Sequence, residues 1–218
     1  MTATLVFGGT FDPVHLGHIG SARALIEDIG DARVVMVPCK LPAHRPVPSA
    51  TAEDRLMMLQ LATEGSPIEV DGRELPRQGT SYTADTLSEY RAELGGDAPL
   101  VFVMGSDAWA TLPSWYRWSD MLDLAHILIM DRPGSDEPVP EVLDDWSRGR
   151  LVNEARMLLS TPAGYICHVT LAPFDVSATE VRRQLSGQEP LTGLLDHRVE
   201  NFIRNRGLYG CDPSEDTS

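Results

Sequence analysis

The sequence predicts an α/β fold of Rossmann-like type, with one doubly wound, mainly parallel sheet of about six strands. Two observations lead to this prediction. Short apolar runs alternate along the chain with longer segments whose apolar residues recur at helical spacing. The run at residues 100–104, Leu-Val-Phe-Val-Met, is continuously apolar, which is typical of a parallel strand that is covered on both faces.

The elements alternate along the chain as strand and helix. A first strand is predicted at residues 5–7, and the helix that follows ends at Gly30, a residue that suits a helix C-terminus. The apolar residues of this helix recur at helical spacing and are Ile19, Ala22, Leu25, Ile26 and Ile29. The later elements are a strand at 33–37, a proline-bearing loop at 39–49, a helix from 51, a strand at 68–70, a helix at 83–94, and strands at 100–104, 127–130 and 165–171.

One domain is predicted for residues 1–210, and its C-terminal part, residues 177–210, is expected to be helical. The acidic, proline-bearing stretch at 134–150 is predicted to be a surface excursion within that domain. Residues 211–218 are polar and acidic and are expected to form a disordered tail.

The charge balance narrows the classes of partner. The 218 residues include 18 Lys and Arg against 32 Asp and Glu, a formal net charge of −14. Such a chain is a poor match for duplex DNA or an anionic membrane, and neither is expected as a partner. A small anionic substrate is still compatible with it, because a cationic pocket can lie inside an acidic surface. A homo-oligomer is also compatible with the sequence.

The cysteines and the apolar runs indicate a cytoplasmic protein. Cys39, Cys167 and Cys211 lie far apart and form no CxxC or Cys/His cluster, so neither a disulfide framework nor a zinc site is predicted. The N-terminus lacks the basic and apolar regions of a signal peptide. No apolar run reaches the roughly 18 residues that a membrane-spanning helix needs.

The turn after the first strand carries the most informative motif, Gly8-Gly9-Thr10-Phe11-Asp12-Pro13-Val14-His15-Leu16-Gly17-His18. Two glycines let backbone N–H groups approach a phosphate, and the helix N-terminus that follows favours negative charge. His15 and His18 share one face of the helix start and could donate hydrogen bonds to phosphoryl oxygens. The alternative is that both histidines are ordinary surface or capping residues. The turn is neither a GxGxxG fingerprint nor a Walker A loop.

Four other segments could contribute to the same site, although each also has an ordinary structural explanation. Ser177 and Glu180 have the spacing of a capping box, which would place Arg182 on the first turn of a helix. Lys40, His44 and Arg45 put three cations in the proline-bearing loop, where a solvated cluster is the alternative. The segment 79–85 opens a helix whose backbone N–H groups could hold a carboxylate better than a carboxamide. Trp115 and Tyr116 could stack on a pyridine ring or simply pack under a loop.

These motifs together resemble one known family. The GGTFDPVHLGH run is similar to the phosphate-binding motif of the nucleotidyltransferases that carry an HxGH signature. Further motifs at 41–45, 79–87, 105–107, 115, 176–182 and 205–209 resemble the bacterial nicotinate-nucleotide adenylyltransferases, and the resemblance extends over nearly the whole chain. Ala43 and Ala178 stand where that family commonly has Pro and Ser.

The resemblance implies a set of site residues. His15, His18 and Arg182 would be the catalytic residues. ATP would contact Gly8, Gly9, Thr10, Phe11, His18, Lys40, Arg45, Gly105, Asp107, Ser177, Thr179 and Arg182. Nicotinate mononucleotide would contact Asp12, His44, Tyr82, Thr83, Asp85, Trp115 and Tyr116. Mg²⁺ would arrive with ATP, and no metal site formed by protein ligands alone is expected.

The predicted function is therefore transfer of the adenylyl group of ATP to nicotinate mononucleotide, which yields deamido-NAD and pyrophosphate. The attack on the α-phosphorus would be direct and in line, because no activated Ser, Cys or Lys nucleophile is evident. Two alternatives stay open from the sequence. One is another adenylyl- or cytidylyltransferase that acts on a different phosphorylated acceptor, and the other is a nucleotide-binding regulator without turnover.

Overall fold

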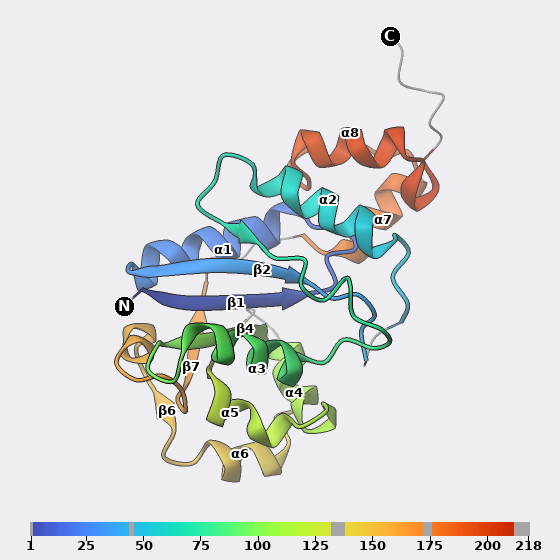
Figure 1. Ribbon diagram of the computed structural model, residues 1–218. Helices are drawn as coiled ribbons and strands as arrows, with labels where there is room; N and C mark the ends of the chain where they lie inside the picture. The colour runs from blue at the N-terminus through green and yellow to red at the C-terminus, as the bar shows by residue number, and fades with distance from the viewer. Residues whose placement is uncertain (1, 44–45, 132–137, 172–175, 212–218) are drawn as a thin grey trace.

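The chain folds around one seven-stranded parallel sheet (Figure 1). The structure is a computed structural model, and it describes residues 2–43, 46–131, 138–171 and 176–211. The strand order is β3-β2-β1-β4-β5-β7-β6. The strands are β1 (Ala3–Gly9), β2 (Ala32–Pro38), β3 (Glu69–Val70), β4 (Leu100–Gly105), β5 (His126–Asp131), β6 (Leu151–Val152) and β7 (Ile166–Thr170).

Helices cover both faces of this sheet, as a continuously apolar strand requires. In β1, Leu5 and Phe7 belong to one buried core and Val6 to the other, because successive side chains of a strand point to opposite faces. The first core is closed by α1 (Leu16–Ile29), α2 (Ala52–Thr63), α7 (Ala178–Ser186), α8 (His197–Asn205) and the 3₁₀ turn η3 (Ala155–Leu159). The second is closed by α3 (Thr83–Leu94), α4 (Ser106–Thr111), α5 (Met121–Leu124), α6 (Glu141–Ser147) and the 3₁₀ turn η1 (Leu112–Ser114). Figure 1 shows the two helical layers above and below the sheet.

The predicted α/β class, with a doubly wound parallel sheet, is confirmed. The six predicted strands correspond to β1, β2, β3, β4, β5 and β7, and the predicted helix at 83–94 coincides with α3. The seventh strand, β6, was not predicted, because it is two residues long and its Leu151 is 56% exposed, so no apolar run marks it.

The acidic stretch at 134–150 is more than a surface excursion. Its described part contains α6, whose Leu143 is fully buried in the second core. Trp146 of the same helix also packs against this core, so two apolar side chains in a charged segment hold α6 on the sheet.

The C-terminal part after residue 176 contains α7, α8 and a final 3₁₀ turn, η4 (Leu208–Gly210), within the described residues. A further 3₁₀ turn, η2 (Trp118–Asp120), precedes α5. Cys211, where the sequence places the start of the tail, is buried. The rest of the predicted tail lies outside the described residues, and the assignment of residues 1–210 to one domain stays a prediction.

Candidate active site

The turn after β1 lies where an open α/β sheet binds ligands. β1 and β4 are neighbours, and the chain continues from them toward opposite edges of the sheet, so their carboxyl ends border a topological switch point. A Cβ at Gly8 would lie 3.1 Å from the Phe102 ring of β4, and a Cβ at Gly9 would lie 2.8 Å from the Phe11 ring. A side chain at either position would crowd one of these rings, and glycine leaves the backbone of the turn open to close approach.

The two predicted catalytic histidines lie together at the start of α1. His15 is the N-cap residue, and its ring stacks on the His18 ring with a centroid distance of 3.7 Å. The backbone N–H of His15 donates to Nδ1 of His18 at 3.3 Å. Since Nδ1 of His18 accepts this bond, the neutral His18 ring carries its proton on Nε2, where it can be donated to a ligand. The Phe11 ring meets the His18 ring edge-on at 5.0 Å and fixes its orientation.

Asp12, predicted to contact nicotinate mononucleotide, has its carboxylate engaged within the protein. The backbone N–H groups of Ser49 and Ala50 donate to it at 2.7 and 3.1 Å, and the Tyr209 hydroxyl donates at 2.7 Å. Burial and this bond to Asp12 raise the pKa of Tyr209. Asp12 therefore joins the turn after β1 to the chain ahead of α2 and to η4 near the C-terminus.

Arg182 reaches the same turn from α7. Its Nη1 donates to the carbonyl oxygen of Asp12 at 2.6 Å, and its Nη2 donates to the Thr179 hydroxyl at 3.3 Å. Ser177 caps α7 by accepting from the backbone N–H of Glu180 at 3.2 Å. The second half of the predicted capping box is wrong, because the Glu180 carboxylate accepts from Arg183 and Gln184 instead.

Lys40 lies beside the turn but is turned toward the segment that precedes α3. Its Nζ donates to the carbonyl oxygen of Arg77 at 2.5 Å, and its backbone N–H donates to the Ser81 hydroxyl at 3.1 Å. The backbone N–H of Ser81 in turn donates to the carbonyl of Leu41 at 3.0 Å. These contacts join the loop after β2 to the start of α3. His44 and Arg45, the other predicted cations of this loop, lie outside the described residues.

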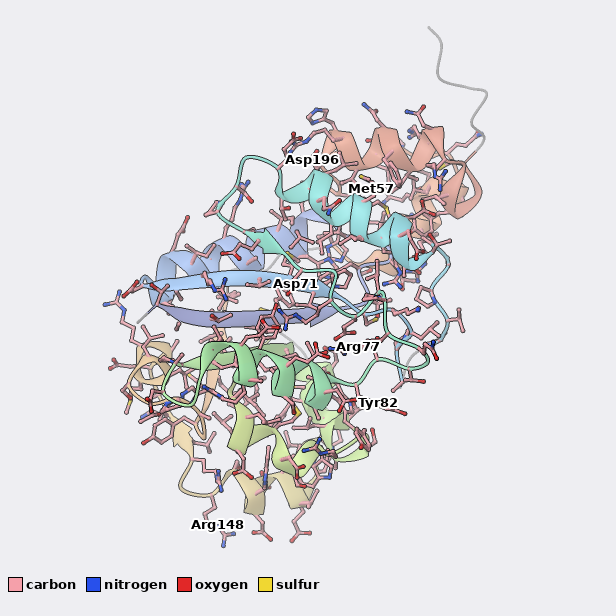
Figure 2. All side chains as sticks on the ribbon, viewed as in Figure 1. Met57, Asp71, Arg77, Tyr82, Arg148 and Asp196 are labelled. Carbon is pink, nitrogen blue, oxygen red and sulfur yellow. The ribbon has the colours of Figure 1, made fainter. Side chains whose placement is uncertain are left out.

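A buried carboxylate supports the start of α3. Glu74 is 6% exposed, and burial raises its pKa. The Thr86 hydroxyl donates to it at 2.5 Å, and Nη1 of Arg77 donates to the same hydroxyl at 2.7 Å. Figure 2 shows Arg77 and Tyr82 on the loop that leads into α3, on the side toward which the sheet strands point.

The aromatic residues predicted to receive a pyridine ring lie close to one another and to the turn. The rings of Tyr82 and Tyr116 are 4.6 Å apart, and Tyr116 is half exposed. Trp115 meets Phe102 edge-on at 6.3 Å, and Phe102 is the ring that contacts Gly8. Trp115 is therefore connected through Phe102 to the carboxyl end of β1, and Tyr116 is its neighbour in the chain.

The remaining predicted residues lie at two element starts. Thr83 is the first residue of α3, and Asp85 in its first turn approaches Arg117 at 3.9 Å. Gly105 ends β4, and Oδ1 of Asp107 lies 2.5 Å from the place that a Cβ at Gly105 would take. A side chain at 105 would displace the Asp107 carboxylate, so glycine leaves room for it in this position.

The structure adds one residue that the sequence interpretation missed. Arg55 of α2 is 1% exposed, and its guanidinium donates to the carbonyl oxygens of Thr10 and Cys39 at 2.7 Å each and of Lys40 at 2.9 Å. The sequence alone does not assign the buried face of this helix, but once the structure does, Arg55 shares that face with Met58, Leu59 and Ala62, which are all buried. An arginine on an apolar face indicates a buried guanidinium with defined partners.

Within the described parts of the chain, no group of three His, Cys, Asp or Glu side chains is placed to hold a metal ion. No helix in those parts is long and apolar enough to cross a membrane.

Comparisons with known proteins agree with this geometry. A family model described as cytidylyltransferase-like matches residues 6–184. The chain is 41% identical over 209 residues to the "Probable nicotinate-nucleotide adenylyltransferase" of Hahella chejuensis, with 95% of each chain covered. It is also 41% identical over 207 residues to the protein of the same description from Serratia proteamaculans, with 94% of each covered.

Among solved structures, the fold is similar to that of Plasmodium falciparum nicotinic acid mononucleotide adenylyltransferase complexed with NaAD. The TM-score is 0.72 at 15% identity, and the match covers 98% of this chain and 100% of that one. At this identity the likeness establishes the fold alone.

Proposed function

Since the chain belongs to the cytidylyltransferase-like family and, within it, to the nicotinate-nucleotide adenylyltransferases, we propose that it transfers the adenylyl group of ATP to nicotinate mononucleotide. The products are deamido-NAD and pyrophosphate, so the reaction is a step of NAD biosynthesis. The observation that carries this proposal is the identity of about two residues in five to named relatives over nearly the whole chain. The paired histidines at the β1–β4 switch point support it.

The phosphate of nicotinate mononucleotide attacks the α-phosphorus of ATP in line, and pyrophosphate leaves. The cysteine beside the turn is not suited to covalent catalysis, because burial raises the pKa of Cys39 and keeps it a thiol. Catalysis then depends on positioning and charge stabilisation. His18 donates from Nε2 to the transferring phosphoryl group, and His15 holds the His18 ring in place.

One group of residues binds the triphosphate of ATP, and a second group binds nicotinate mononucleotide. The turn 8–11, with Arg182 and Thr179 of α7 beside it, receives the triphosphate. The start of α3 receives the nicotinate carboxylate through backbone N–H groups at Thr83, and the aromatic side chains near it receive the pyridine ring. A carboxylate accepts at two oxygens and carries charge, so this arrangement favours nicotinate over nicotinamide.

A divalent cation, Mg²⁺ in our proposal, enters with ATP. The described residues offer few ligands for this cation, since the Asp12 carboxylate already accepts hydrogen bonds from three donors. Mg²⁺ is commonly coordinated by phosphate oxygens and water. Bound there, it would neutralise charge on the triphosphate. We further propose a cytoplasmic location, in keeping with three unpaired cysteines. A homo-oligomer remains compatible with the sequence.

The test is pyrophosphate release from ATP with a panel of phosphorylated acceptors. The proposal expects rapid release with nicotinate mononucleotide and little with phosphopantetheine or an alcohol phosphate. Preferential release with either of the latter would assign the protein to another branch of the family. ATP binding without acceptor-dependent release would indicate a regulator instead.

A further inference from the structure

Arg55 is a buried cation that donates to four main-chain carbonyls in the described part of the chain. Besides Thr10, Cys39 and Lys40, its Nε reaches the carbonyl oxygen of Ala50 at 3.4 Å. No carboxylate among the described residues forms an ion pair with it, whereas its neighbour Asp54 pairs with Arg206. Burying a charge without an opposite charge is costly, and bonds to neutral carbonyls offset only part of that cost.

The carbonyls that Arg55 holds belong to the segments that build the site. Thr10 directly follows the two glycines after β1, and Cys39 and Lys40 directly follow β2. Ala50 lies next to Ser49, and both donate their N–H groups to Asp12. One guanidinium therefore joins the carboxyl ends of two adjacent strands to the chain ahead of α2.

The contact with Thr10 also sets the direction of the next peptide. In a trans peptide the C=O and N–H point in opposite directions, so a Thr10 carbonyl on Arg55 turns the N–H of Phe11 away from the guanidinium. Phe11 itself has a φ of 50°, in the left-handed region, which a bulky residue adopts only where its surroundings hold it. The Arg55 bond just before Phe11 is one of the contacts that hold it.

We propose that Arg55 is a positioning residue for the triphosphate of ATP. It fixes the backbone of the phosphate-binding turn, and it supplies a buried positive charge for which the polyphosphate is the counter-anion. Arg55 does not touch the substrate in this proposal. It acts through the peptide groups of the turn and through a charge that is screened little because it is buried. The inference deepens the proposed function and rests on it for the place of ATP.

The chain contains a matched control in Arg91 of α3. Its guanidinium also donates to four main-chain carbonyls, those of Gly95, Ala98, Leu124 and Pro162, at 2.7 to 3.0 Å. These carbonyls precede β4, β5 and β7, so they lie at the amino ends of the strands. The site lies at the carboxyl ends. Arg91 therefore makes the same kind of backbone contacts as Arg55, although it is less buried, and none of its partners belongs to the phosphate-binding turn.

The experiment compares Arg55→Met with Arg91→Met, and Arg55→Lys with Arg91→Lys. Binding of ATP with Mg²⁺, of inorganic tripolyphosphate and of adenosine is measured by calorimetry without acceptor, and KM is measured for both substrates. We expect Arg55→Met to weaken ATP and tripolyphosphate binding about 10-fold or more, as for a lost charge-assisted contact. Binding of adenosine and the KM for nicotinate mononucleotide should change about twofold or less, which is within the effect of a distant surface substitution.

The lysine variants keep the test decisive if the methionine variants do not fold. Lysine retains the charge but cannot span four carbonyls, so Arg55→Lys should weaken tripolyphosphate binding about threefold while Arg91→Lys leaves it unchanged. Equal effects of the variants at 55 and 91, or equal effects on both substrates, would reduce Arg55 to a structural role.

The two proposals fail in different ways. A wild-type protein that binds ATP without transferring to nicotinate mononucleotide contradicts the proposed function alone. A wild-type protein that turns over normally, with Arg55 and Arg91 variants that bind tripolyphosphate alike, contradicts the role of Arg55 alone.

Discussion

Replacing Gly17 by Ala tests how closely the parts of the active site are packed. A Cβ at this position would lie 2.8 Å from Cγ1 of Val176, ahead of α7, and 3.0 Å from Nδ1 of His15. Carbon atoms in contact prefer about 3.5 Å or more, so a Cβ there would come roughly 0.7 Å too close to Val176. The His15 ring or the segment ahead of α7 must therefore move.

Two opposing contributions set the effect on stability. Alanine is better than glycine inside a helix by about 1 kcal/mol, whereas overpacking costs about 1–3 kcal/mol. We expect the free energy of unfolding to fall by about 0–2 kcal/mol on these two grounds. Activity should fall much more, by about 100-fold, because a misplacement near 1 Å has that effect on positioned catalytic groups.

The assay pairs steady-state pyrophosphate release with urea unfolding of the same preparations. Gly96→Ala is the control, since a Cβ at Gly96 meets no atom within 4 Å. The reasoning is refuted if Gly17→Ala keeps wild-type kcat/KM, because the His15 ring would then tolerate the displacement that the close contact requires.

Three further outcomes are expected. His18→Ala should lower kcat by about 100-fold or more, as for loss of a transition-state donor, and near-full activity would remove His18 from the mechanism. Tyr209→Phe removes one of the three donors to Asp12 and should lower the free energy of unfolding by about 1.5–3 kcal/mol in urea titrations. An unchanged free energy of unfolding would show that this hydrogen bond does not stabilise the fold. His126 donates from Nε2 to Thr161 and accepts at Nδ1, and burial lowers its pKa below 6.5, so the unfolded chain takes up a proton that the folded chain does not. The contribution of His126 to stability should therefore be constant above about pH 7 and decrease as pH falls below about 6.5, and His126→Gln should flatten that part of the profile.

Much of the fold could be predicted because its signals are local. β1 alternates between two cores in a run of apolar residues, and α3 ends at Gly95, a residue that suits a helix C-terminus. β6 gave no such signal, since its two residues lie between charged and polar neighbours and Leu151 is exposed. For α2 the apolar residues lie all around the helix, so the sequence does not assign its buried face. Met57 and Met58 are the same residue type, yet Met57 is 44% exposed and Met58 is buried.

The site was predictable as a set of motifs and less so as a set of contacts. His15 and His18 lie in one short motif, and their pairing follows from helix geometry. Asp12 lies in the same motif, yet its carboxylate is engaged by residues 37 to 197 positions away, which no local pattern reveals. Arg55 was missed for the same reason, because its partners are backbone carbonyls that become neighbours only when the sheet forms.

The central claim concerns which acceptor receives the adenylyl group. The most direct measurement follows ATP labelled in its α-phosphate and compares kcat/KM for nicotinate and nicotinamide mononucleotides. Our account expects the label to appear in deamido-NAD, with one pyrophosphate released per dinucleotide formed, and nicotinate mononucleotide to be the better acceptor by about 10-fold or more, as for a charged hydrogen-bonded contact. Equal rates with the two acceptors would contradict the carboxylate site at α3, and no labelled dinucleotide with either would contradict the function itself.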